Sequence, residues 1–236
     1  MSNKSIAIIP ARGGSKRIPK KNIIDFFGIP MIACTIKAAL DSKMFDRVLV
    51  STDDEEIAEV ARKYGAEVPF LRATANDDFS HVSAATIAAL EQAESYWNEK
   101  YDTVVQLMAN CPLRNADDIR VSMNYFLEHD EAFQISCFEY GWMNPWWAAK
   151  LDENNQPERL FSEADSKRSQ DLDKLYCPSG AIWIAQASKL KTSGSYYGPG
   201  HIYKALDWTS SVDIDEENDL EMAGAIQLML KARSSE

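Results

Sequence analysis

A stretch rich in glycine and cations follows the first apolar run of the chain. It reads Pro10-Ala11-Arg12-Gly13-Gly14-Ser15-Lys16-Arg17-Ile18-Pro19-Lys20-Lys21-Asn22. Two glycines let the backbone turn tightly and bring its N–H groups close to a ligand. Arginine binds phosphate through a fork of donors and lysine binds it as a point charge, so we predict that Arg12, Lys16 and Lys21 neutralise a polyphosphate. The stretch is neither a Walker loop nor a G-x-G-x-x-G motif, and a solvated basic loop is the alternative.

Two aspartates near the other end of the chain have a spacing that suits a metal ion. The segment Ser211-Val212-Asp213-Ile214-Asp215 alternates acidic and apolar residues. On an extended strand, residues two apart point the same way, so Asp213 and Asp215 should face a site while Val212 and Ile214 face the core. Mg²⁺ prefers hard oxygen ligands and shares them with substrate phosphates. We therefore predict a magnesium site rather than a pair of exposed loop acids.

These two segments need a scaffold, and the hydrophobic pattern predicts one of alternating strands and helices. Strands are expected at 6–10, 47–51, 66–71, 103–108, 133–138 and 181–185, and helices at 30–42, 53–64, 82–97, 115–127 and 217–230. Such alternation predicts an α/β protein with three layers, α/β/α, around a mostly parallel, Rossmann-like sheet. Ligands of these folds lie at the carboxyl ends of the strands.

One region interrupts the alternation. Residues 139–178 contain the adjacent Trp146 and Trp147, a polar turn and a charged stretch. We predict a single domain over residues 1–236, with an inserted arm at about 139–178 rather than a second domain.

Composition and charge exclude several classes of protein. The net charge of −11 argues against nucleic acid as a partner, because phosphate backbones require a basic face. No run of about 18 apolar residues exists, so no membrane span is expected. The early apolar run is too short for a signal peptide, and we expect a cytoplasmic protein. The four cysteines and three histidines lack the spacing of a zinc site.

The basic residues are unevenly distributed. Those that precede the first acidic residue, Asp25, are Lys4, Arg12, Lys16, Arg17, Lys20 and Lys21. An even distribution would place about two of the basic residues there. A local cationic cluster on an acidic protein indicates a small anionic ligand.

The stretch at 10–22 resembles the signature loop of the CMP-sugar synthetases, the acylneuraminate cytidylyltransferase family. In that family the loop binds the phosphates of CTP, and Arg12, Lys16, Lys21 and Asn22 stand at its functional positions. The likeness extends over roughly residues 5–230 and implies a nucleotidyltransferase fold. The family also carries a D-x-D segment near its C-terminus, which implies that Mg²⁺ is held by the two aspartates at 213 and 215.

The resemblance also implies residues for the cytidine. Residues 68–72 match the family, which places Arg72 at the nucleoside. A serine that contacts the cytosine is implied shortly afterwards, and Ser80 and Ser83 are both candidates.

The departures from the family pattern all fall on the sugar side. Leu107 to Arg114 resembles L-Q-P-T-S-P-L-R, with Met108 in place of the glutamine that contacts the sugar. Cys177 stands where the sialic-acid enzymes have an arginine, and Trp147 or its neighbourhood where they have a lysine. The residues that the resemblance assigns to the sugar are Met108, Asn110, Trp147, Arg168 and Gln170. Trp142, Trp146 and Trp147 are candidates to line the pocket, with core or interface packing as the alternative.

Together these features predict a cytidylyltransferase that joins CMP from CTP to the anomeric hydroxyl of a nonulosonic acid and releases pyrophosphate. The altered sugar side indicates a relative of sialic acid, such as a pseudaminic or legionaminic acid. Arg12, Lys21, Asp213 and Asp215 are the expected catalytic residues. The alternatives are an enzyme for another sugar, such as Kdo, and a catalytically silent nucleotide-binding or assembly paralogue. The arm resembles the family's dimerisation element, which implies a homodimer in which Arg168 is a candidate to serve the neighbouring subunit's site.

Overall fold

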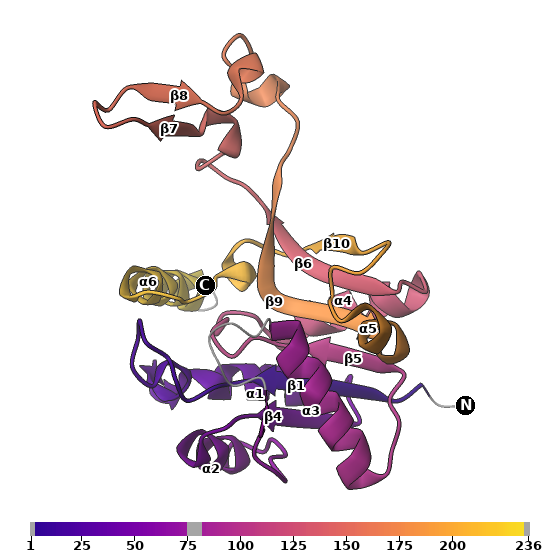
Figure 1. Ribbon diagram of the computed structural model, residues 1–236. Coiled ribbons are helices and arrows are strands. Elements are labelled where there is room, and N and C mark those ends of the chain that lie inside the picture. Colours follow the sequence, from indigo (N-terminus) through magenta and orange to yellow (C-terminus); the bar gives the residue numbers. More distant parts are fainter. Residues whose placement is uncertain (1–2, 75–81, 234–236) are drawn as a thin grey trace.

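A six-stranded sheet forms the centre of the molecule in the computed structural model, which describes residues 3–74 and 82–233 (Figure 1). The strand order is β10-β6-β9-β5-β1-β4. The bounds are β1 (Ser5–Pro10), β4 (Arg47–Ser51), β5 (Thr103–Gln106), β6 (Phe133–Glu139), β9 (Tyr176–Gln186) and β10 (Ile202–Ala205). Only β9 runs antiparallel to its neighbours in this sheet. The expected mostly parallel α/β sheet is confirmed.

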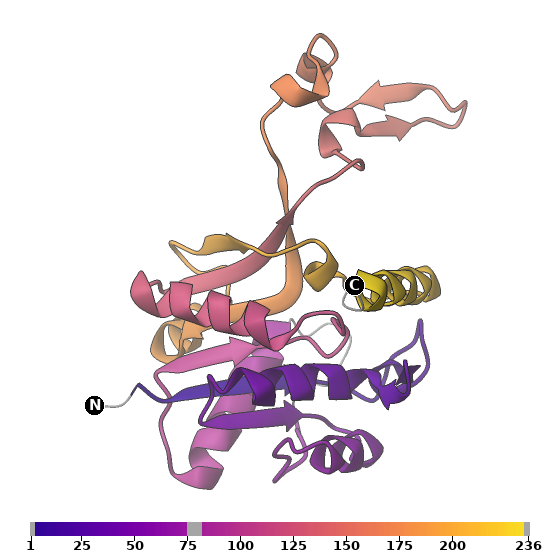
Figure 2. The ribbon, with the colours of Figure 1, turned by 180° about the vertical axis from the view of Figure 1, so that it is seen from behind.

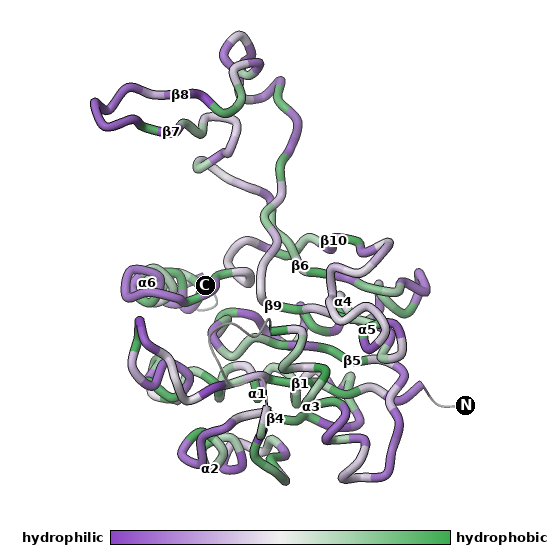
Figure 3. Tube along the Cα trace, in the orientation of Figure 1, coloured by the Kyte–Doolittle hydropathy of each residue, from purple (hydrophilic) through white to green (hydrophobic). Residues whose placement is uncertain are grey.

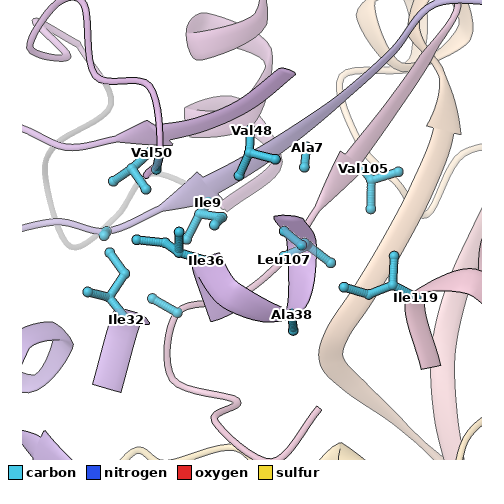
Figure 4. Packing of buried hydrophobic residues seen from close by; sticks show 14 of the residues in the cluster. Ala7, Ile9, Ile32, Ile36, Ala38, Val48, Val50, Val105, Leu107 and Ile119 are labelled. Atoms are coloured by element: carbon cyan, nitrogen blue, oxygen red, sulfur yellow. The ribbon is translucent and has the colours of Figure 1, made fainter. Parts of the chain in front are cut away.

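Helices cover both faces of the sheet, because its central strand is apolar on both sides. Ala7 and Ile9 of β1 join one core with α1 (Met31–Ser42), α2 (Glu55–Lys63) and α4 (Ala116–Glu128), part of which Figure 4 shows. Ile6 and Ile8 join a second core with α3 (Val82–Trp97) and α5 (Ala187–Ser193). Figure 1 shows α3 over one face, and Figure 2 shows α1 and α4 over the other. The hydropathy trace is accordingly green along much of the central strands and purple in many connecting loops (Figure 3).

A third core lies at the edge where the two motifs meet. It packs the small hairpin of β2 (Asp25–Phe26) and β3 (Ile29–Pro30) against α6 (Glu217–Arg233). Val212 and Ile214 are buried in the same cluster. The last helix therefore covers the segment that carries the aspartate pair. None of the described helices is long and apolar enough to cross a membrane.

Side-chain caps mark the starts of two helices, α2 and α4. Asn115 caps α4 in a capping box with Asp118. The cap of α2 is Asp54, whose carboxylate accepts the N–H of Ile57, so the expected start at Asp53 is wrong by one residue. The strand expected at 66–71 is also wrong, since only an isolated bridge between Leu49 and Glu67 forms there.

Strands β6 and β9 extend out of the sheet into a projection formed by residues 140–175 (Figures 1 and 2). It contains the short hairpin of β7 (Ala149–Leu151) and β8 (Pro157–Arg159) and three single 3-10 turns. Ala164 is the only hydrophobic side chain buried within it, whereas Trp142 is 88% exposed. A segment with so little core of its own leaves apolar surface open to solvent.

Candidate active site

The cationic loop and the aspartate pair lie against each other, although they are almost the whole chain apart. Lys21 Nζ donates to Asp215 Oδ1 at 2.8 Å and to the carbonyl oxygen of Ile214 at 2.8 Å. Arg17 Nη2 lies 2.9 Å from Asp215 Oδ2. The Lys21 side chain is only 14% exposed, so this ion pair is screened less than a surface pair.

A pocket of about 390 Å³ opens where these segments meet the carboxyl ends of β1 and β5. Its wall consists of Pro10, Arg12, Ser15, Lys16, Arg17, Lys21, Asn22, Met108, Ala109, Asn110 and Asp215. The volume falls in the range of small-molecule sites, and the position at the strand ends is the usual one in open α/β sheets.

Hydrogen bonds to the backbone hold the cationic loop in its shape. Asn22 Nδ2 donates to the carbonyl of Arg12 at 2.9 Å, and the N–H of Gly13 donates to Asp53 Oδ1 at 2.9 Å. A Cβ atom at Gly13 would lie 2.5 Å from the Asp54 carboxylate, so this close approach requires glycine. Asp53 thus supports the loop, a role that the sequence reading missed. The available signal was its position just beyond β4, at the same sheet edge as the loop.

The two aspartates alternate with buried apolar residues, as expected, but they do so on an irregular segment and not on a strand. Burial and the charge of Asp215 raise the pKa of Asp213 to about 6, with Lys21 opposing them. Burial would also raise the pKa of Asp215, but the hydrogen bonds and charges of Lys21 and Arg17 outweigh it and lower that pKa. The pair therefore holds one readily ionised carboxylate beside one that resists ionisation.

The donor set at this edge fits Mg²⁺. In the described part of the chain, no three His, Cys, Asp or Glu side chains are grouped closely enough to hold a metal ion by themselves. Mg²⁺ usually takes only one or two protein carboxylates and completes its shell with water and substrate phosphates. Asp213 and Asp215, next to a polyphosphate-sized cationic pocket, provide that arrangement.

Arg72, which the resemblance assigns to the nucleoside, and Ser83, one of the two candidate serines, are both buried. Arg72 Nη1 donates to the carbonyl and hydroxyl oxygens of Ser51, at 2.9 and 3.2 Å. Burial lowers the pKa of Arg72, and the charge of Asp53 counteracts this. Ser83 Oγ accepts the N–H of Tyr196 at 3.4 Å in the second core. Ser80 lies outside the described residues.

The structure divides the residues assigned to the sugar into two groups. Met108 and Asn110 line the pocket. Trp147, Arg168 and Gln170 lie in the projection and do not line the pocket of their own chain. Arg168 is 73% exposed and binds Asp171 through both Nε and Nη2, at 2.7 and 3.0 Å.

A glycine of β9 that sequence reasoning did not single out lies close to Met108 and Asp213. Residues 179–182 of β9 bulge opposite Ser136, whose hydroxyl accepts the N–H of Ile182 at 2.9 Å. A Cβ atom at Gly180 within this bulge would lie 3.0 Å from Met108 Cγ and 3.1 Å from Asp213 Oδ2. Gly180 therefore lets the strand approach the acid pair closely.

Comparisons with known proteins find similarity to cytidylyltransferases. A family model described as "Cytidylyltransferase" matches residues 6–229. The chain is 40% identical to a pseudaminic acid cytidylyltransferase of Campylobacter jejuni, over 93% of this chain and 94% of that protein. It is 32% identical to a CMP-N,N'-diacetyllegionaminic acid synthase of Legionella pneumophila, over 91% and 92%. In fold it is similar to a CMP:2-keto-3-deoxy-manno-octonic acid synthetase complexed with CTP, with a TM-score of 0.72 at 16% identity, covering 96% of this chain and 99% of that one.

Proposed function

This chain belongs to the cytidylyltransferase family, and from that premise we propose that it transfers CMP from CTP to the anomeric hydroxyl of a nonulosonic acid. The observation that carries the proposal is the contact of Lys21 with Asp215 at the wall of one pocket. Cations for a triphosphate and carboxylates for a divalent ion are thereby brought to the same place.

The main requirement of the proposed reaction is to compensate the negative charge on the α-phosphate and on the leaving pyrophosphate. The sugar hydroxyl oxygen bonds to the α-phosphorus of CTP, the bond from that phosphorus to the bridging oxygen breaks, and pyrophosphate leaves with the negative charge. Arg12, Lys16 and Lys21 line one pocket, and in this proposal they offset charge on the α-phosphate and on the leaving pyrophosphate. Asp213 and Asp215 would hold Mg²⁺, which when bound supplies positive charge shared with phosphate oxygens and favours loss of the hydroxyl proton.

For the sugar we propose a pseudaminic-type acid. The 40% identical relative is named for that sugar, and Met108 presents an apolar side chain to the pocket where a sialic-acid enzyme would have an amide. The likeness to the Kdo enzyme is one of fold alone at 16% identity, which supports the Kdo alternative less. That the enzyme works in the cytoplasm stays a prediction.

A pyrophosphate-release assay tests the proposal. The wild-type protein with Mg²⁺ and CTP is offered pseudaminic, legionaminic, sialic and Kdo acids in turn, and release is expected to be fastest with the first. A thermal-shift panel of CTP, UTP, GTP and ATP checks the base, because a bound nucleotide stabilises the fold by mass action. Stabilisation by CTP without release from any sugar would support the silent paralogue instead.

We further propose a homodimer formed through the projection. Trp142, Met143 and Leu151 are 88%, 64% and 65% exposed, which is the kind of apolar surface that an interface covers. In the proposed twofold dimer, each projection reaches the pocket of the other subunit. Arg168, which does not line the pocket of its own chain, would then contribute to the partner's pocket. A mass measurement in solution is expected to give two chains.

Arg168 acting across the dimer predicts complementation between two inactive variants. Co-expressed Lys21→Ala and Arg168→Ala chains form mixed dimers in which one site carries both changes and the other carries neither. With random pairing about half of the dimers are mixed, and each of these has one unaltered site. Activity should therefore reach about a quarter of that of the same amount of wild-type protein. Activity that stays at the level of the separate variants would place Arg168 in its own chain's site or outside the reaction.

A further inference from the structure

Asn110 hydrogen-bonds to residues 213–215, the segment that carries the aspartate pair, through both its backbone and its side chain. Its carbonyl oxygen accepts the N–H of Ile214 at 2.9 Å. Its side-chain Nδ2, which carries two hydrogens, lies within hydrogen-bond distance of three oxygens: the carbonyl of Ile214 at 3.0 Å, Asp213 Oδ1, and Asp215 Oδ1 at 3.4 Å. Asn110 itself is only 5% exposed, so bulk water competes little for its own donors.

The segment depends on such contacts because no strand ladder holds it. Residues 212–216 are irregular, and the two carboxylates that they carry repel each other. Beyond Asn110, the segment is held by Lys21, which donates to Ile214 and Asp215, and by Asp219, which accepts the N–H of Asp215 at 2.9 Å. Asn110 contacts both carboxylates at once and therefore fixes one relative to the other.

Asn110 is itself held firmly by the loop that follows β5. The carbonyl of Met108 accepts the Thr35 hydroxyl at 3.2 Å and Arg114 Nη1 at 3.4 Å. The same Arg114 nitrogen donates to the carbonyl of Ala181 at 2.7 Å, and the Arg114 side chain is fully buried. The loop is thus tied to α1 and β9, and Asn110 transmits that rigidity to the aspartates.

We propose that Asn110 is a positioning residue, which sets the spacing and orientation of the Asp213 and Asp215 carboxylates for Mg²⁺ and does not bind the sugar. The inference rests on the proposed function and assigns Asn110 a role different from the one that the resemblance implied. An amide suits this task because it donates two hydrogen bonds without carrying a charge. A lysine in its place would compete with the metal ion for both carboxylates.

The test compares Asn110→Ala with wild type in two measurements. Outer-shell partners of metal ligands typically contribute ten- to a hundred-fold in affinity or rate. We expect the Mg²⁺ concentration for half-maximal pyrophosphate release to rise about ten-fold, with the KM for the sugar nearly unchanged. Mn²⁺ binding to the protein without substrates, followed by electron paramagnetic resonance, should weaken by a similar factor.

Asn110→Ser, which keeps one donor, should recover part of the loss and also serves if the alanine variant folds poorly. The matched control is Asn115→Ala, which removes the side-chain cap of α4 and so lowers stability without touching the aspartates. Its metal dependence should equal that of wild type. Normal Mn²⁺ binding in Asn110→Ala, or a raised sugar KM with normal Mg²⁺ dependence, would overturn the proposal. Absence of pyrophosphate release from the wild type would instead count against the proposed function.

Discussion

Replacing Lys21 by methionine is expected to lower turnover about a hundred-fold or more while leaving the protein folded. The loss of one preorganised charge at a reacting phosphate typically costs a few kcal/mol of barrier. In the free protein the Nζ atom of Lys21 already lies 2.8 Å from Asp215 Oδ1 at the pocket wall. Methionine keeps most of the side-chain volume, so packing around the stem should be preserved. Pyrophosphate release at saturating CTP and sugar measures the effect.

Lys20→Met provides the matched control for this variant. Lys20 is the neighbouring cation of the same loop, but its side chain is 65% exposed and pairs with Glu56 away from the pocket wall. An exposed pair contributes little to stability, so turnover and melting temperature should both stay near wild type. Equal turnover in Lys21→Met and Lys20→Met would remove Lys21 from the catalytic mechanism.

The second large effect is expected for Asp213→Asn, which should reduce turnover about a thousand-fold, because a metal ion bound to phosphate oxygens contributes several kcal/mol. The substitution keeps the size of the side chain and an oxygen that can accept from Asn110, but it removes the charge that holds a cation. Glu216→Gln is the control. Glu216 adjoins the pair, is 65% exposed and contacts Arg17, and its loss should change turnover little.

The pH dependence of the free energy of unfolding shows whether Asp213→Asn loses activity because it unfolds. Burial and Asp215 raise the pKa of Asp213 from 3.8 to about 6, so the folded protein binds this proton more tightly than the unfolded chain does. The wild type therefore loses stability from this group as the pH rises between those two values, whereas an asparagine at position 213 makes no such pH-dependent contribution. Without magnesium, Asp213→Asn should be the more stable protein above about pH 6, with a gap that narrows toward pH 4. A variant less stable than wild type at pH 7 would contradict the burial argument.

Sequence patterns predicted the sheet and the meeting of the two motifs well, because each rests on strong local physics. The apolar run at 6–10 had to be a central strand, and a glycine-rich cationic loop after such a strand lies at the ligand edge. The alternation of Val212 and Ile214 with two aspartates predicted which side chains are buried, even though the segment is not a strand. The alternation of buried and partly buried side chains at 212–215 follows from packing against the third core and needs no strand hydrogen bonds.

Other features depend on contacts that local patterns do not contain. Asp53 was read as a helix start, yet its carboxylate binds the N–H of Gly13, 40 positions away. Asn110 was assigned to the sugar by resemblance, and only the fold shows that its amide points at the aspartates. The bulge that brings Gly180 to Asp213 depends on the Ser136 hydroxyl across the sheet. Each is a long-range pairing whose partner atoms the local sequence pattern does not identify.

The contact between Lys21 and Asp215 has a consequence for the newly made chain. The two residues are 194 positions apart, so a ribosome adding about 5–20 residues per second exposes the cationic loop about 10–40 s before its acidic partner. Throughout that interval the nascent polypeptide lacks the carboxylate with which Lys21 pairs in the folded protein. Because we propose that Asp213 and Asp215 hold Mg²⁺, we expect a chain that terminates before position 213 to release no pyrophosphate.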